Sequence, residues 1–136
     1  PLADWSEARE RAILRRGTPL DAELLEFART LGIADPEQVR VELSTTVPLP
    51  LPDPLVRLAQ AVGLPVFRPA GMALGRGIAA LEPRPSLLRH ELVHVHQYQR
   101  LAGHRPFMRR YLYECLHLGY HEAPLEAEAR ERSAAA

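Results

Sequence analysis

The first third of the chain contains two stretches in which hydrophobic positions recur with helical spacing. Residues 5–16 and 20–31 place apolar side chains three or four positions apart among charged ones, which is typical of amphipathic helices. Thr18-Pro19 has the residue types that begin a helix, and Gly32 has the type that ends one. We therefore expect a pair of N-terminal helices, the second opened by Thr18-Pro19 and closed by Gly32.

Strand-like patterns and a proline-rich connection follow these helices. Over residues 38–43, apolar side chains alternate with charged ones, as in a half-buried strand. Residues 48–54 hold a proline at every second position, which excludes a regular helix or a central strand. We expect a further helix over 55–62, a short strand over 65–68 and a longer strand over 72–81.

The C-terminal half contains residues of the types that begin and end helices, and their positions predict three helices. Ser86 can cap a helix that runs to about Ala102, because serine side chains accept hydrogen bonds from the free N–H groups of a first turn. A second helix is expected over 107–118, where Gly119 stops it. Pro124 opens the last helix.

Length and composition indicate one domain, and the predicted helices and strands indicate the α+β class. The chain has 136 residues, of which 46% are hydrophobic and 25% charged, and this suits a single compact core. We expect one domain over 1–136, with N-terminal helices and a first strand in 1–47. A small twisted sheet and the C-terminal helices make up the rest.

The charge balance and the cysteine count exclude several classes of function. Seventeen basic residues offset seventeen acidic ones, so nucleic acid is not an expected partner. No window approaches the roughly 20 apolar residues of a membrane span, and we expect a cytoplasmic protein without a membrane partner. A lone Cys115 leaves histidine and carboxylate as metal ligands. The basic residues are all arginine, which is typical of a high-GC genome and compatible with a thermophilic source.

The chemistry concentrates in the motif His90-Glu91-Leu92-Val93-His94. On a helix, residues four apart lie one turn along the same face, so His90 and His94 can both direct a ring nitrogen at one metal ion. Glu91 lies about 100° around the helix from His90, where it can reach a water molecule without serving as a ligand. This spacing predicts two metal ligands and a general base.

A catalytic zinc site needs a third protein ligand, for which Glu126 is the first candidate. Gln97 and Arg100 stand where metzincins place glycine and histidine, which excludes that class. Glu126 falls in the first turn of the last helix, where the chain returns to the histidine pair. Glu128 is the second candidate, about 200° around that helix. His121, Glu122 and Glu114 come next.

The segments HELVHVHQ and, some thirty residues later, PLEAEA resemble the zincin metallopeptidases, specifically their short glutamate-ligand type, the minigluzincins. The resemblance covers residues 71–130, which would form the metal-site core. It implies that His90, His94 and Glu126 hold Zn²⁺ and that Glu91 is the general base.

The resemblance also implies a zincin-like fold with a substrate-binding edge strand. That strand precedes the motif helix and takes up the substrate as an added strand. Here it corresponds to the predicted strand over 72–81, with Ala73, Leu74 and Gly75 as substrate-binding residues. No organic cofactor is expected.

These features predict a zinc endopeptidase that acts on a peptide or protein substrate. The alternative is a non-catalytic module in which zinc stabilises the fold and a surface binds another protein. Larger gluzincins carry a further residue that stabilises the oxyanion, and Tyr111, Tyr120 or His121 could supply that donor. A partner protein could complete the cleft, because little chain follows the third ligand.

Overall fold

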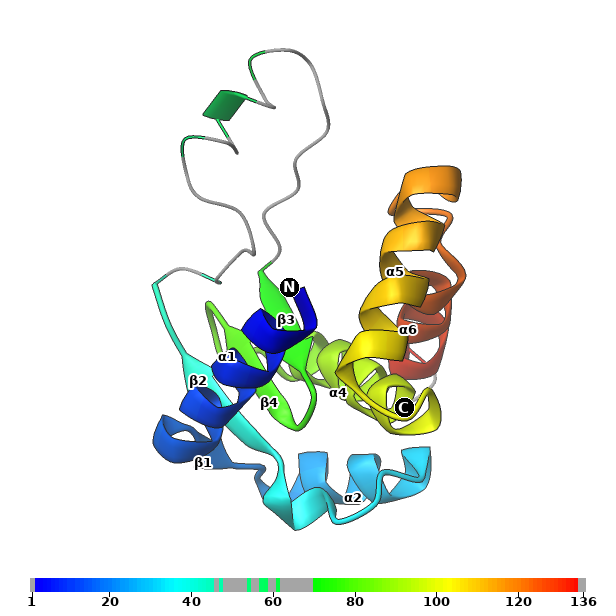
Figure 1. Cartoon of the computed structure of the whole chain (residues 1–136). Coiled ribbons are helices and arrows are strands. Elements are labelled where there is room, and N and C mark those ends of the chain that lie inside the picture. The colour runs from blue at the N-terminus through cyan, green and yellow to red at the C-terminus, as the bar shows by residue number, and fades with distance from the viewer. Residues whose placement is uncertain are drawn as a thin grey trace.

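The computed structural model describes residues 2–45, 47, 54, 57–58, 61 and 70–134. In these residues the elements follow the order α1 (Leu2–Arg16), β1 (Thr18–Pro19), α2 (Ala22–Leu31), the 3-10 helix η1 (Pro36–Gln38), β2 (Arg40–Leu43), β3 (Gly71–Leu74), β4 (Gly77–Ala80), α4 (Pro85–Arg100), α5 (His104–Leu118) and α6 (Pro124–Ala134) (Figure 1). The expected elements over 48–54, 55–62 and 65–68 lie, apart from the isolated positions, outside the described residues. Helices together with a four-stranded sheet confirm the α+β class.

The start of α2 differs from the prediction, whereas its end agrees. Thr18–Pro19 forms the short strand β1, so the expected helix start at these residues is wrong. The cap is Asp21, whose side chain accepts a hydrogen bond from the Leu24 backbone N–H at 2.9 Å. Gly32 ends the helix in the left-handed conformation with φ of 88°, which glycine adopts without steric cost.

The segment expected as one strand over 72–81 is a hairpin of two strands. β3 and β4 are joined by a two-residue turn at Gly75 and Arg76, and Gly75 has a φ of 64°. A side chain at Gly75 would collide with the carboxylate of Glu10 on α1. The turn therefore depends on glycine for both its backbone conformation and its close approach to α1.

The sheet has the strand order β1-β2-β4-β3, so β3 lies at one edge. β2 and β4 are parallel, whereas β3 pairs with β4 and β1 with β2 in the antiparallel sense. Successive side chains of the hairpin point to opposite faces. Leu74 and Ala79 pack with Ile13 of α1, whereas Ala73 and Ile78 belong to the larger core that includes α4.

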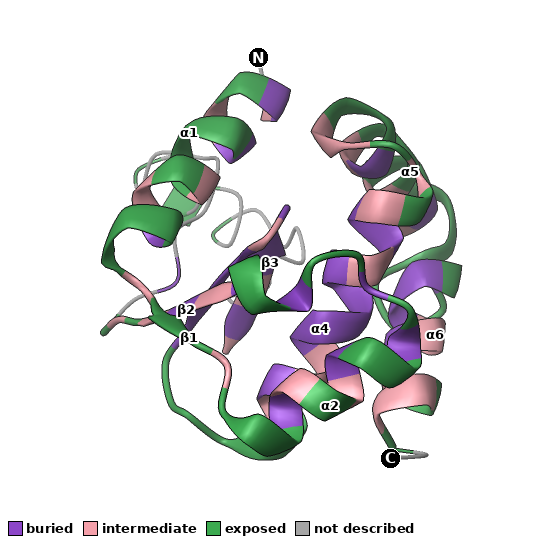
Figure 2. Ribbon diagram, turned by 90° about the horizontal axis from the view of Figure 1, so that it is seen from below, coloured by how far each residue is buried: buried purple, intermediate pink, exposed green. Residues whose placement is uncertain are grey.

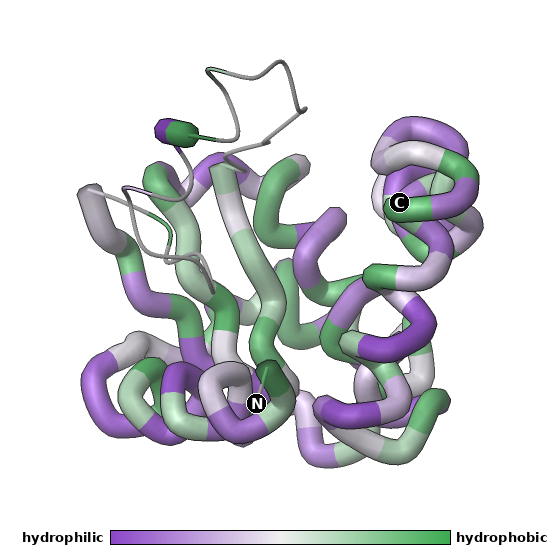
Figure 3. The backbone as a smooth tube through the Cα atoms, turned by 45° about the horizontal axis from the view of Figure 1, so that its top comes forward, coloured by the Kyte–Doolittle hydropathy of each residue, from purple (hydrophilic) through white to green (hydrophobic). Residues whose placement is uncertain are grey.

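Helix α4 is the most deeply buried helix of the described chain (Figure 2). It packs against the sheet, α2 and α6, and hydrophobic positions gather on the strands and helix at the centre (Figure 3). The expected cap at Ser86 is wrong, because Pro85 takes the first helical position and Arg84 is the cap residue. The helix ends at Arg100, two residues before the expected end.

The last two helices follow the predicted order. α5 begins at His104, three residues earlier than expected, and Gly119 ends it. α6 begins at Pro124 as expected. No described helix is both long enough and apolar enough to cross a membrane.

Candidate metal centre

The two histidines of the motif lie one turn apart on α4, and their ring centroids are 5.0 Å from each other. His94 is buried, and His90 lies partly open to solvent. His90, Glu91 and His94 each offer a ligand atom, and these atoms lie within 4.8 Å of one another. The helical spacing therefore brings together a group that is close enough to bind a metal ion.

Glu126 reaches this group from the first turn of α6. Its Oε1 lies 3.0 Å from Nε2 of His90, and its Oε2 lies 3.0 Å from Nε2 of His94. Its exposed fraction is 2%. The carboxylate thus bridges the two rings, with one oxygen on each. Glu126 therefore lies within hydrogen-bond distance of both histidines of the group that could hold a metal ion.

Glu128 points elsewhere. Its carboxylate accepts two hydrogen bonds from the Arg100 guanidinium, at 2.9 and 2.8 Å, and one from the side-chain amide of Gln97. The hydrogen bonds from Arg100 lower the pKa of Glu128 to about 2. Of the two candidate ligands in α6, Glu126 contacts both histidines, whereas Glu128 is hydrogen-bonded to Arg100.

The other candidate ligands have different neighbours. The buried carboxylate of Glu114 accepts hydrogen bonds from the backbone N–H of Leu125 and from Arg110, both at 2.8 Å. It therefore satisfies the N-terminus of α6. His121 and Glu122 are exposed in the turn before α6.

Glu91 lies beside the histidine pair in a buried position, with an exposed fraction of 4%. Its Oε2 is buried and has no hydrogen-bond partner among the described residues. Burial raises the pKa of this carboxyl, although the charges of His94 and His90 oppose the change. A buried oxygen without a partner normally interacts with a water molecule or an ion.

The contact between His94 and Glu126 shifts the pKa values of both groups. Burial opposes protonation of His94, but the hydrogen bond to Glu126 and the charge of Glu91 outweigh it and raise the pKa of His94 to about 9. Burial likewise disfavours the charged form of Glu126, but the hydrogen bonds with His90 and His94 lower its pKa below the usual range. Because metal ligands bind in their deprotonated form, a cation would compete with a proton at this pair.

Tyr111 supports the same carboxylate. Its hydroxyl donates a hydrogen bond to Oε2 of Glu126 at 2.7 Å. Burial and the neighbouring charge of Glu126 raise the pKa of this hydroxyl above the usual range. Tyr111, one of the candidate oxyanion donors, thus packs partly buried against the main core and hydrogen-bonds to Glu126.

Gln97 is a functional candidate that sequence reasoning missed. Its exposed fraction is 0%, and its Oε1 lies 2.7 Å from Nδ1 of His94. Its amide nitrogen donates to the backbone carbonyl of Leu125 at 3.0 Å and to Glu128 at 2.6 Å. A glutamine three positions after the second histidine was the available signal, since these two side chains share one helix face.

The expected substrate-binding residues lie partly in different places. Ala73 and Leu74 are on the edge strand β3, but their side chains are buried in the two cores. Gly75 is in the turn beyond the strand. Only the main chain of β3 could therefore pair with an added strand, and Gly75 is not part of that strand.

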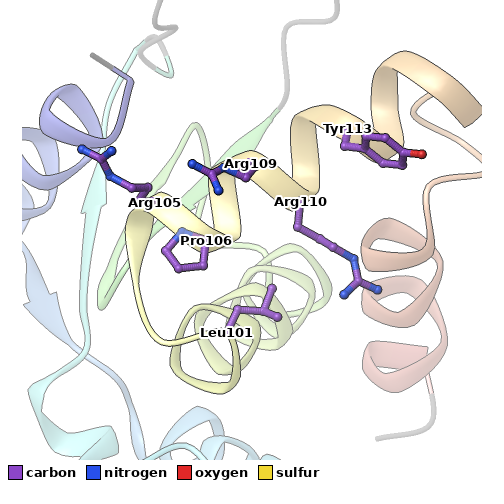
Figure 4. Close-up of a pocket in the computed structure, with 6 residues that line it drawn as sticks. All are labelled: Leu101, Arg105, Pro106, Arg109, Arg110 and Tyr113. Atoms are coloured by element: carbon purple, nitrogen blue, oxygen red, sulfur yellow. The ribbon is translucent and has the colours of Figure 1, made fainter.

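Three arginines of α5 line a hollow beside this helix, and one of them is paired with a glutamate. Figure 4 shows Arg105, Arg109 and Arg110 around a hollow beside α5, with guanidinium groups that point in different directions. Arg110 pairs with Glu114. The nearby aromatic ring of Phe107 is buried. It is therefore not available to stack on a nucleic-acid base, as aromatic rings do in proteins that bind single strands.

Comparisons with protein families, curated proteins and solved structures found no match to this chain.

Proposed function

We propose that this chain is a zinc-dependent peptidase of the zincin type, with Glu91 as the general base. The observation that carries this proposal is the buried Oε2 of Glu91, which has no partner among the described residues and lies beside two histidines. A site that only held metal through His90, His94 and Glu126 would gain nothing from a further buried carboxylate oxygen without a partner, because its burial is costly. A catalytic base needs such an oxygen to accept a proton.

His90, His94 and Glu126 are the proposed ligands. Glu91 is also near the histidines, but it neighbours His90 on the same helix and points about 100° away from it. Glu126 comes from another helix and already contacts the Nε2 atoms of both rings. Two imidazoles and one carboxylate form a ligand set that catalytic zinc uses.

The proposed chemistry assigns proton transfer to Glu91. When bound, zinc would supply a Lewis acid that lowers the pKa of a water molecule. Glu91 takes the proton from the water that attacks the peptide carbonyl carbon and delivers it to the departing amine. The raised pKa of Glu91 suits this role, because the carboxyl must hold the proton between the two steps.

The proposed substrate is an extended peptide, cleaved within its chain. The edge strand β3 leaves one side of its main chain unpaired within the described sheet, and an extended segment can add to such an edge. Gly71 at the start of β3 lies against Glu91, so the edge leads to the proposed base. A partner protein that completes the cleft stays a prediction.

The test compares wild type with Glu91→Gln, which preserves size but cannot accept the proton. We expect the variant to keep its zinc and its fold and to lose about 100-fold or more of its casein hydrolysis. Glu82→Gln is the matched control, because Glu82 is exposed and pairs only with Arg84 among the interactions described. Equal turnover by wild type and Glu91→Gln would contradict the proposal.

The second candidate function is a zinc-stabilised interaction module without catalysis. The contact of Glu126 with both histidines favours it, because this contact already ties α6 to α4. This function predicts zinc-dependent stability together with no hydrolysis by wild type. Hydrolysis that depends on Glu91 would exclude it.

A further inference from the structure

An imidazole that binds a metal through Nε2 must keep its remaining proton on Nδ1, and a nearby acceptor selects that tautomer. For His94 such an acceptor is 2.7 Å from Nδ1, in the side-chain amide of Gln97. Both side chains belong to α4 and are buried. The atom of Gln97 that faces the ring therefore determines which ring nitrogen carries the proton.

The other contacts of Gln97 identify that atom. On its opposite side the amide meets the backbone carbonyl of Leu125 and the carboxylate of Glu128. Both groups can only accept, so the NH₂ group must point to them and Oε1 must point to His94. The reverse orientation would place an oxygen against two acceptors. Because Oε1 only accepts, Nδ1 of His94 must be the donor.

Glu128 keeps this orientation because Arg100 holds its carboxylate in a two-point hydrogen bond. Such pairs combine charge with a defined geometry. A continuous series of contacts thus runs from Arg100 through Glu128 and Gln97 to His94. It joins the last turns of α4 to the first turns of α6.

We propose that Gln97 is a positioning residue that holds His94 in the Nδ1–H tautomer and so presents Nε2 to the metal, with Glu128 and Arg100 fixing Gln97. This assignment rests on the proposed metal site. Glu128 does not contact the histidines, and in this assignment it acts through Gln97, whose orientation it fixes.

The first test replaces the acceptor without changing the volume greatly. Gln97→Met should weaken zinc binding 10- to 100-fold, the usual effect of losing a partner of a ligand histidine. Gln99→Met is the matched control on the same helix, since the Gln99 amide bonds to the backbone of Ala34. The control should stay within about threefold of wild type. Affinity is measured by competition with a chromophoric chelator.

A second variant tests the orientation and remains informative if Gln97→Met does not fold. Gln97→Glu combined with Glu128→Gln exchanges the two groups. The carboxylate at position 97 then accepts a hydrogen bond from Nδ1 of His94. The amide at position 128 donates a hydrogen bond to the carboxylate at position 97 and accepts one from Arg100. The bond to the Leu125 carbonyl and one of the two hydrogen bonds from Arg100 are lost. We expect zinc affinity within about threefold of wild type, in contrast with the 10-fold or greater loss in Gln97→Met.

Nitrogen NMR of the zinc-loaded protein provides the readout that packing alone would not change. In wild type and in the exchanged double variant, Nδ1 of His94 should be protonated and Nε2 metal-bound. A wild-type spectrum with protonated Nε2, Gln97→Met affinity equal to wild type, or a double variant that loses 10-fold or more would overturn the assignment. Wild type that binds no zinc would instead overturn the proposed function, and this assignment with it.

Discussion

Glu91 and Glu126 are both buried carboxylates, but their oxygens differ in what they contact. Both oxygens of Glu126 are engaged, by His90, His94 and Tyr111. Oε2 of Glu91 is buried without a partner in the described chain. Because each engaged oxygen is held in place, Glu126 suits a fixed ligand. The free oxygen of Glu91 suits a group that must accept and release a proton.

The first prediction concerns the space beside Glu91. A Cβ at Gly71 would lie 3.2 Å from Cγ of Glu91 and 3.2 Å from Cδ1 of Leu87, which is closer than ordinary contact. Gly71→Ala should therefore displace Glu91 by a few tenths of an ångström. We expect peptide hydrolysis to fall by up to about 100-fold with zinc affinity unchanged, because the ligands are not touched.

Peptide turnover and zinc affinity measured on the same Gly71→Ala protein separate these effects. Unchanged turnover would show that Glu91 does not need this position. A parallel loss of zinc would show that Gly71 supports the ligands instead.

The motif could be predicted from the sequence because its geometry is local: His90, Glu91 and His94 lie on one helix, so their spacing alone determines their directions. Glu126 could be ranked above Glu128 because Pro124 marks the start of its helix. The contact of Gln97 with His94 is local to α4 and has a signal in the spacing. The contacts of Gln97 and Tyr111 with α6 could not be predicted, since they depend on how α4, α5 and α6 pack. A buried glutamine is apparent only when its partners on another helix are known.

Among the elements, ends set by local chemistry were predicted best. Two helices end at the expected glycines, Gly32 and Gly119, and the last helix begins at Pro124 as expected. The start of α2 was missed because Thr18–Pro19 pairs with β2, and that pairing is not local. The hairpin of β3 and β4 was also missed. Its turn contacts α1 through a hydrogen bond from the Arg76 backbone N–H to Glu10, and that contact is not local.

The contact between α4 and α6 provides a prediction about pH. Glu128 has a pKa of about 2 in the folded chain, against 4.5 for an ordinary glutamate. Between these values the unfolded chain binds more protons, so the stabilisation is complete above about pH 4.5 and is lost as the pH falls towards 2. Glu128→Gln should therefore lower the free energy of unfolding at pH 7, by an amount that shrinks as the pH falls below 4.5.

Urea unfolding of wild type and Glu128→Gln at pH 7, 5 and 3 measures this difference. Glu82→Gln is the control, because its ion pair with Arg84 is exposed and such pairs contribute little. A difference for Glu128→Gln that stays constant over this range would contradict the account.

In the whole molecule, α4 contacts the sheet and the helices α2 and α6. This position buries the motif from several sides, and α6 brings its carboxylate to the histidines. The α+β class was predictable because the helical and alternating patterns are both present in the chain. The arrangement of layers was not, since the parallel pairing of β2 with β4 joins strands that are far apart in the sequence.

The most direct test of the central claim is the zinc content of the purified protein after equilibration with zinc and removal of the free metal. The account predicts close to one zinc per chain for wild type and almost none for the double variant His90→Ala with His94→Ala. Far-UV circular dichroism checks that this variant is folded. Stoichiometric zinc retained by the folded double variant would contradict the account.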